Sequence, residues 1–157
     1  MKYLSILLLS VFFLFISCNK DEENHVEEFI ITNYFYEDFP ARDDTGLLSD
    51  SLYFIDSEEK LKQITSNIPS IYDKIKTTDF NNNTILITAS RDDYNIHSSE
   101  IKMTFDTLYK TCNLIFSFVL GEPPVLEKTY FRVWVCVIPK MPIEPKKSYT
   151  HVNISGS

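Results

Sequence analysis

The apolar residues of this chain take the spacing of a helix in one stretch, and this stretch constrains the fold more than any other feature. Between residues 61 and 75 they recur every three or four positions, as on the buried face of a helix. This stripe consists of Leu61, Ile64, Ile68, Ile71 and Ile75. From residue 84 onward the apolar residues alternate with polar ones or form short runs, which are patterns of strands. The sequence therefore predicts one helical unit followed by an extended region.

The helical unit carries a start signal and an interruption. Asp56 is a candidate N-cap, and Glu59 three residues later completes a capping box. Pro69 breaks the apolar stripe, because proline lacks a backbone donor and crowds the preceding turn. We therefore expect the helix to kink or restart at Pro69.

Extended segments surround the helical unit. They are predicted at residues 26–36, 52–55, 84–90, 100–106, 111–120, 129–138 and 149–154. The polar stretch 91–98 predicts a loop, and Gly121-Glu122-Pro123-Pro124 predicts a hairpin loop between two long strands. One helical unit beside an antiparallel meander is an α+β pattern. The predicted fold class is therefore α+β, with the helical unit packed on an antiparallel β-meander sheet.

The chain begins with the pattern of an export signal. Lys2 precedes an apolar run from Tyr3 to Ile16, which is 14 residues long. A helix that spans a membrane needs about 20 residues, so this length suits a signal-peptide core better. We divide the chain into a signal peptide at 1–17, an acidic tether at 18–28 and a single α+β domain at 29–157.

The residues that follow the apolar run are Ser17, Cys18, Asn19, Lys20, Asp21 and Glu22. Ser17-Cys18 resembles the lipobox of bacterial lipoproteins. The string from Cys18 to Glu22 resembles the export signal of surface lipoproteins in some Gram-negative bacteria, which is Cys, any residue, Lys and two acids. The resemblance implies that Cys18 carries the lipid, with palmitate among its chains, and that Lys20, Asp21 and Glu22 direct export. It also implies attachment to the outer membrane, facing the cell exterior. The alternative is a cleaved signal with Cys18 as an incidental thiol.

The charge balance limits the partners. The chain has 15 basic and 22 acidic residues, a net charge of −7. Nucleic-acid binding needs clustered Lys and Arg, so no nucleic acid is expected as a partner. An acidic surface also repels anionic lipids, so contact with the membrane is expected through the N-terminal lipid alone.

No cofactor and no metal is expected. The chain has three glycines and no glycine-rich phosphate loop. His25, His97 and His151 lack the spacing of zinc ligands. No nucleophile motif of a hydrolase is present either. These observations disfavour an enzyme, although catalytic triads are defined by geometry and not by sequence position.

The order of elements in residues 52–140 carries a second resemblance. The predicted helix is followed by a turn with Asp79-Phe80 and by the strand Thr84-Ile85-Leu86-Ile87. After them come a polar loop, an amphipathic strand, a hairpin and Val137-Ile138-Pro139-Lys140. This order resembles the C-terminal domain of the protease-complex subunit PrcB. That family often has a glycine-rich segment after its second strand, where this chain has residues 91–97 without glycine. The resemblance implies a fold and no particular partner.

The one dense polar cluster in the domain lies between residues 91 and 100. Arg91, Asp93 and His97 are the candidate ligand-binding residues of this loop. An alternative hypothesis is a small exported enzyme in which Asp92, Asp93, His97 or Glu100 performs acid–base chemistry. A solvated connection between strands would explain the same residues without any ligand.

Cys112 and Cys136 are the cysteines that remain beside Cys18. A hairpin centred on Pro124 would place them opposite each other, within reach of a disulfide in an exported protein. The alternative is two buried free cysteines that act as small apolar residues.

Two further sites are predicted from a short motif. Asp50-Ser51-Leu52 and Asp106-Thr107-Leu108 resemble a bacterial O-glycosylation motif, in which Ser51 and Thr107 would be modified.

The predicted function is a lipid-anchored, surface-exposed, non-catalytic binding or accessory lipoprotein whose partner is a protein or a glycan.

Overall fold

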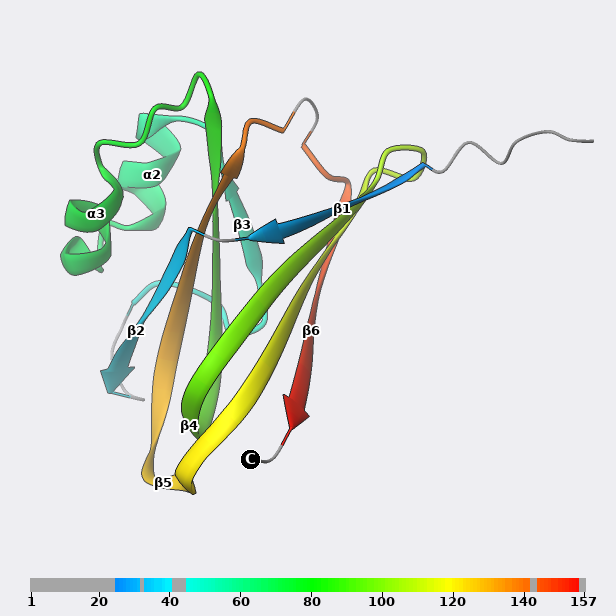
Figure 1. The fold of residues 1–157 in the computed structure, drawn as a ribbon. Coiled ribbons are helices and arrows are strands. Elements are labelled where there is room, and N and C mark those ends of the chain that lie inside the picture. Colours follow the sequence, from blue (N-terminus) through cyan, green and yellow to red (C-terminus); the bar gives the residue numbers. More distant parts are fainter. Residues whose placement is uncertain (1–24, 32, 41–44, 142–143, 156–157) are drawn as a thin grey trace, which may run out of the picture.

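The computed structural model describes residues 25–31, 33–40, 45–141 and 144–155 (Figure 1). The elements are β1 (Val26–Ile31), β2 (Tyr34–Pro40), β3 (Leu52–Ile55), α2 (Glu58–Ile64), α3 (Pro69–Ile75), β4 (Asn83–Asp106), β5 (Thr111–Pro139) and β6 (Lys147–Ser155). They form a six-stranded sheet in which β1, β4, β5 and β2 are successive neighbours, β3 pairs with β4, and β6 pairs with β5. The β5–β6 pairing is parallel and all the others are antiparallel.

The sheet is organised by one long hairpin of β4 and β5. Its turn lies at residues 107–110, where the Asp106 carboxylate accepts hydrogen bonds from the backbone N–H groups of Leu108 and Tyr109, both at 2.9 Å. Lys110 adopts a positive φ of 54° that helps close this turn. Pairing continues from this turn to the far end of the hairpin, where Asn83 lies opposite Pro139.

Both long strands bend part-way along their length (Figure 1). The register between β4 and β5 shifts at three places between Asp92 and Ser98, and such bulges bend a strand and increase its twist. Gly121 lies at this bend, where an added Cβ atom would come within 3.1 Å of the Asn95 side chain. The bend divides the sheet into two arms that pack against each other.

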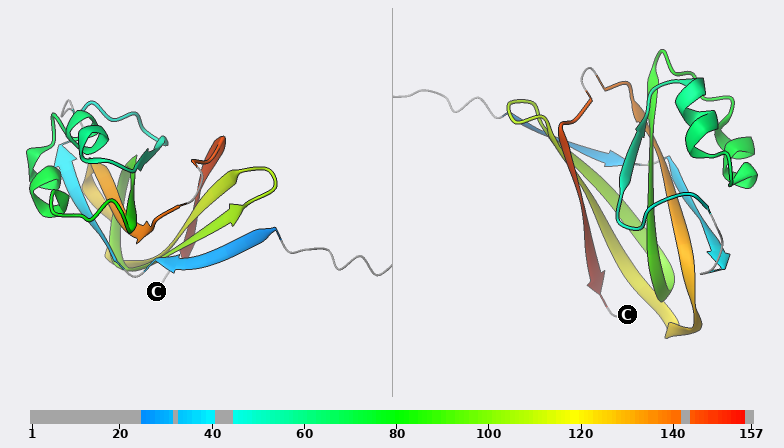
Figure 2. Two further views of the ribbon diagram at one scale, coloured as in Figure 1. Left: turned by 90° about the horizontal axis from the view of Figure 1, so that it is seen from above. Right: turned by 180° about the vertical axis from the view of Figure 1, so that it is seen from behind.

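We define the arms by their strands. The helix-covered arm consists of β3, residues 83–92 of β4, residues 130–139 of β5, and β2. The open arm consists of β1, residues 98–106 of β4, residues 111–119 of β5, and β6. Figure 2 shows both helices on one side of the helix-covered arm and the open arm on its other side.

Two hydrophobic clusters follow from this layering. The first lies between the arms and includes Leu86, Trp134, Cys136, Ile138, Ile101, Met103, Phe105, Cys112, Leu114, Phe116 and Phe118. The second lies between the helix-covered arm and the helices and includes Ile85, Ile87, Val133, Val135, Leu61, Ile68, Ile71 and Ile75. The helix-covered arm is therefore buried on both faces, and the open arm on one.

The expected fold class is wrong. The protein is mostly β-sheet, with 62% of it in strands, and its described residues form two short helices and a mixed sheet in place of a helical unit on an antiparallel meander. The error has a physical cause, because the stretches predicted as loops at 91–98 and 121–124 lie inside β4 and β5. The chain reverses at residues 107–110, and not at Pro124.

Four residues of the helical stripe are buried and Ile64 is half-buried, and the stripe runs over two separate helices. Ser57, and not Asp56, caps α2, since its hydroxyl accepts a hydrogen bond from the backbone N–H of Lys60 at 3.3 Å. A new helix, α3, begins at Pro69. Proline is tolerated there because the first backbone N–H groups of a helix have no partner within the helix.

The tether predicted at 18–28 overlaps the fold. Residues 26–28 belong to β1, and Glu28 lies opposite Thr104 of β4. Cys18, Lys20, Asp21 and Glu22 lie outside the described residues, so their predicted roles stay predictions. In the part of the chain that the structure describes, neither helix has the length and apolar character to cross a membrane.

Candidate binding cleft

The densest group of charges sits at the bend. Arg132 is 2% exposed, and its Nε and Nη2 atoms donate to the two carboxylate oxygens of Asp38 at 2.6 and 2.9 Å. Its Nη1 atom donates to Asp92 at 2.8 Å, and its guanidinium lies 4.8 Å from the centre of the Tyr36 ring. These contacts join β2, β4 and β5 where the arms meet, and they neutralise a buried cation with two carboxylates.

Asp92 belongs to this group and not to an open acid–base site. Burial raises the pKa of its carboxyl, against the opposing effect of the Arg132 charge. One carboxylate oxygen accepts from Arg132, and the other accepts from the Ser90 hydroxyl at 3.0 Å. Both oxygens are therefore engaged in holding the bend.

The other residues predicted between 91 and 100 are spread along β4. Arg91 and His97 are exposed and Asp93 is half-buried, while Glu100 lies 3.7 Å from Lys102. Within the described residues, no hydrogen bond or ion pair joins Arg91, Asp93 and His97 to one another, and no group of three His, Cys, Asp or Glu side chains could hold a metal ion. A ligand at these residues stays a prediction.

The two cysteines lie in different arms. Cys112 lies opposite Phe105 in the open arm, and Cys136 lies opposite Leu86 in the helix-covered arm. Both are free and buried, and burial raises the pKa of each thiol to about 12. The predicted hairpin pairing of these residues is therefore wrong, and they occur as buried free thiols in the cluster between the arms.

The two predicted glycosylation residues lie at the ends of elements. Ser51 is half-buried directly before β3, after Asp50 with its positive φ of 61°. Thr107 is exposed in the hairpin turn, and its hydroxyl donates to the backbone carbonyl of His25 at 3.1 Å. Their modification stays a prediction.

The strongest candidate for a binding site is the opening between β3 and β6, which we call the cleft. β3 has only four residues, so it faces the beginning of β6 and leaves the rest of that nine-residue strand without a strand opposite. Figure 2 shows these two strands on either side of the opening. Two cavities lie along it, one beside β3 and one beyond its end.

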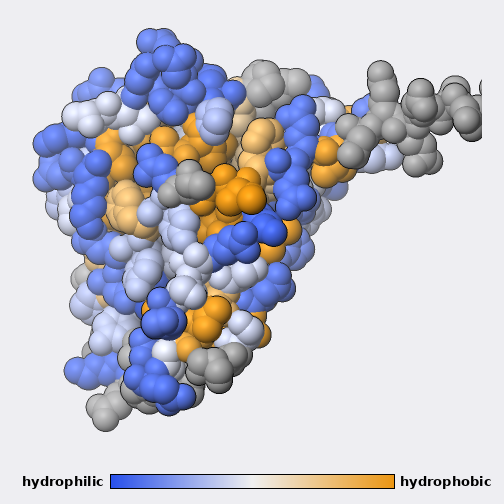
Figure 3. Space-filling view, in the orientation of Figure 1, coloured by the Kyte–Doolittle hydropathy of each residue, from blue (hydrophilic) through white to orange (hydrophobic). Residues whose placement is uncertain are grey.

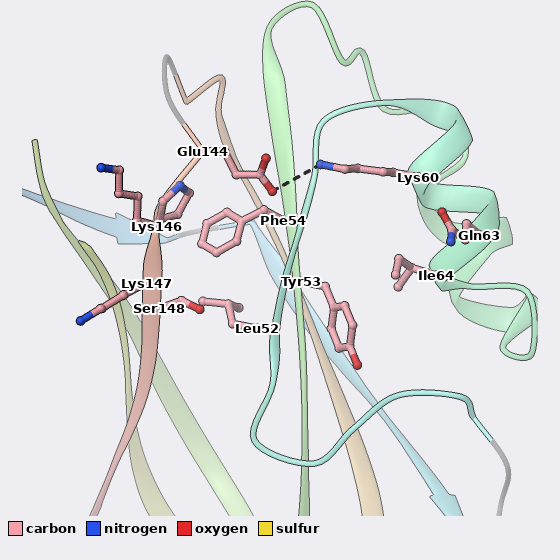
Figure 4. A pocket seen from close by; sticks show the side chains of 11 residues that line it. Leu52, Tyr53, Phe54, Lys60, Gln63, Ile64, Glu144, Lys146, Lys147 and Ser148 are labelled. Atoms are coloured by element: carbon pink, nitrogen blue, oxygen red, sulfur yellow. Dashed lines mark hydrogen bonds and ion pairs between the residues drawn. The ribbon is translucent and has the colours of Figure 1, made fainter. Parts of the chain in front are cut away.

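The first cavity has a volume of about 350 Å³. Figure 4 shows Leu52 and Phe54 of β3 pointing toward β6, with Ser148 of β6 directed back toward Leu52. Lys60 of α2 reaches across the upper end to Glu144 at 3.5 Å. An ion pair therefore bridges this end of the cleft. Its lining combines apolar side chains of β3 with the polar side chains of Lys60, Gln63, Glu144, Lys146, Lys147 and Ser148.

The second cavity is a narrow aromatic slot of about 130 Å³. Its lining residues are Asp50, Thr88, Ala89, Ser90, Phe116, Phe118, Trp134, Thr150 and Val152. The rings of Phe118 and Trp134 stack across the two arms at 5.2 Å, so the slot opens directly onto the cluster between the arms. Val152 on its rim is 50% exposed. The Thr150 hydroxyl is buried with no hydrogen-bond partner among the described residues.

A second apolar surface lies on another face. Figure 3 shows hydrophobic residues gathered over β1 and the upper part of β5, with hydrophilic residues around them. Ile30 of β1 is 63% exposed, and a cavity of about 230 Å³ is lined by Phe29, Met103, Phe105 and Met141. Of the cavities that the described residues line, this surface has one and the cleft has two, so the cleft is the stronger candidate.

Comparisons of the chain with protein-family models, curated proteins and solved structures find no match.

Sequence reasoning did not find the cleft. The sequence does predict one wall of the cleft, since the edge strand predicted at 149–154 is part of β6. Nothing in the sequence shows that this strand runs parallel to β5 or that β3 is too short to face all of it.

Proposed function

We propose that this protein is a lipid-anchored, surface-exposed, non-catalytic binding lipoprotein whose partner enters the cleft. The observation that carries this proposal is the aromatic slot, where core residues Phe116, Phe118 and Trp134 line a cavity that opens beside a half-exposed strand. Apolar cavities with a few polar groups are typical of binding sites.

The titratable groups support binding over catalysis. The buried acid with a raised pKa, Asp92, has both oxygens engaged by Arg132 and Ser90. A general base has to reach a substrate proton, and Asp92 would first have to leave these partners. The slot itself is lined by one carboxylate, that of Asp50.

Site-specific photo-crosslinking in intact cells tests this function. A photoreactive amino acid replaces Val152 at the cleft or, as the control, Ile30 on β1, which is 63% exposed. We expect a partner to be crosslinked from position 152 and not from position 30. Equal crosslinking from both positions would contradict binding through the cleft, and substrate turnover by the purified protein would contradict a non-catalytic role.

The membrane anchor requires its own test. Mass spectrometry of the mature N-terminus is expected to show a lipid on Cys18 and the loss of residues 1–17. A mature chain that begins at Asn19 or later and carries no lipid would exclude the anchor while leaving the cleft proposal intact.

A further inference from the structure

We infer that the partner of the cleft is an extended peptide segment of another protein, which pairs as a β-strand with the free edge of β6. This inference rests on the proposed function and adds the shape and the chemistry of the partner. Within the described chain β6 pairs with β5 alone, so from Tyr149 to Ser155 one row of its backbone N–H and C=O groups faces the cleft. Such an edge is a template for an added strand.

β6 lacks the features that normally protect an edge strand. It is nine residues long, contains no proline, and pairs with β5 without a break in register. Its one Lys, Arg, Asp or Glu residue is Lys147 at its start. Val152 and Ile154 are 50% and 43% exposed on the side that carries Thr150. An edge with these properties is open to pairing over its last seven residues.

The inner side of β6 determines which side chains the partner presents to the slot. Ser148 lines the first cavity, and Thr150 and Val152 line the second, so alternate residues of β6 point into the cleft. A strand paired with β6 would direct its own alternate side chains the same way, onto Phe118 and Trp134. These partner side chains are therefore apolar, because they would contact the rings that line the slot.

The outer side of β6 determines the charge of the partner. Tyr149 lies on the outer side, where it lines a further cavity with Lys146 and Lys147, two residues that also border the first cavity of the cleft. In Figure 4 the Lys146 and Lys147 side chains point away from β3, and neither forms an ion pair with a described residue. Side chains opposite each other on neighbouring strands interact, so acidic residues on the partner complement this end of β6. The partner strand thus alternates apolar and polar residues, with acids near Lys147.

The test uses full-length protein in detergent and an array of synthetic octapeptides that alternate apolar and polar residues. Binding is followed by the fluorescence of Trp134, which is the one tryptophan of the chain and lines the slot. We expect bound peptides to carry acids at one end and to saturate the fluorescence change, with new hydrogen-exchange protection confined to residues 149–155. Methylating the peptide amides that face β6 should weaken binding by about tenfold or more, because it removes backbone donors and keeps every side chain.

Val152→Lys places a charge on the edge and is expected to abolish peptide binding, while Ile30→Lys, at an exposed position on β1 three strands away from β6 in the sheet, should leave it unchanged. Equal affinity of the methylated peptides, protection outside β6, or no binding by any octapeptide would each overturn the strand mode. A dimer that protects residues 149–155 and excludes the peptides would assign the edge to a second copy of this chain and also overturn it. If the natural partner still crosslinks at position 152 while the octapeptides fail, the proposed function stands and the strand mode falls.

Discussion

The two arms contain segments of the same two strands, yet they bury different shares of their residues. In the helix-covered arm, every residue from Thr84 to Ala89 is buried. In the open arm, burial alternates, and Ile101, Met103 and Phe105 are buried while the residues between them are half-exposed. The difference shows that a single long strand can be buried on both faces before a bend and on one face after it. The helices cover the part of the strand that is apolar on both faces.

The largest effect is expected at the bend that joins the arms. Arg132→Ala leaves Asp38 and Asp92 without their cation and should reduce the free energy of unfolding by about 3–5 kcal/mol. Arg91→Ala is the matched control at an exposed position and should change it by less than about 0.5 kcal/mol. Urea denaturation measures both. If the two variants lose similar stability, the bend is not held by this ion cluster.

Matched isoleucine substitutions test the arms directly. Ile87 is fully buried between the helix-covered arm and the helices, so Ile87→Ala should cost about 2–5 kcal/mol. Ile115 is half-buried on the outer side of the open arm, so Ile115→Ala should cost less than about 1 kcal/mol. Denaturant melts of the two variants decide the point, and equal losses would mean that the outer side of the open arm is covered in solution.

The two free cysteines report on how often each arm opens. Their thiols are buried with a pKa of about 12, so alkylation at neutral pH requires local opening. We expect Cys112 in the open arm to react faster than Cys136 in the helix-covered arm. Pulsed alkylation followed by peptide mass spectrometry measures each rate. The same rate for both would show that the arms open together, and a disulfide between them would contradict the structure.

The smallest effect concerns pH at the bend. The pKa of Asp92 is raised in the folded protein, first by burial, so its stabilising contribution is fully present below the ordinary value of 3.8 and is lost as pH rises through the raised value. The stability of the wild type relative to Asp92→Asn should therefore fall as pH rises through this window. Urea midpoints for the two proteins at several pH values test the sign. A rise would mean that attraction to Arg132 outweighs burial.

The sequence predicts the positions of most elements but not how they pair. The stripe at Leu61, Ile68 and Ile71 and the alternation at Ile101, Met103 and Phe105 identify buried faces correctly, because these patterns depend on local periodicity. The pairing of β4 with β5 over both arms depends on contacts far apart in sequence. Polar residues at 91–98 and prolines at 123–124 are normal signals for loops, and a bulged bend uses them inside strands.

The candidate site was less predictable than the fold. Trp134, Phe116 and Phe118 could be assigned to strands, but their shared slot depends on the packing of the two arms. The sequence places Asp92 and Asp93 together in one predicted loop, whereas in the structure Asp92 is bound to Arg132, which is 40 residues away along the chain. Such a contact leaves no local pattern, because it depends on the tertiary fold.

The pairing of β2 with β5 has a consequence for folding kinetics. Tyr34 lies opposite Cys136, about a hundred residues away along the chain. β2 can therefore pair with β5 only after a long loop has closed. The turn at residues 107–110 closes a loop of only a few residues, so β4 and β5 can begin to pair beside this turn before β2 pairs with β5. Proteins dominated by such distant pairings fold in roughly milliseconds to seconds, and we expect this chain to fold in that range, with the turn forming early and the β2 edge forming late.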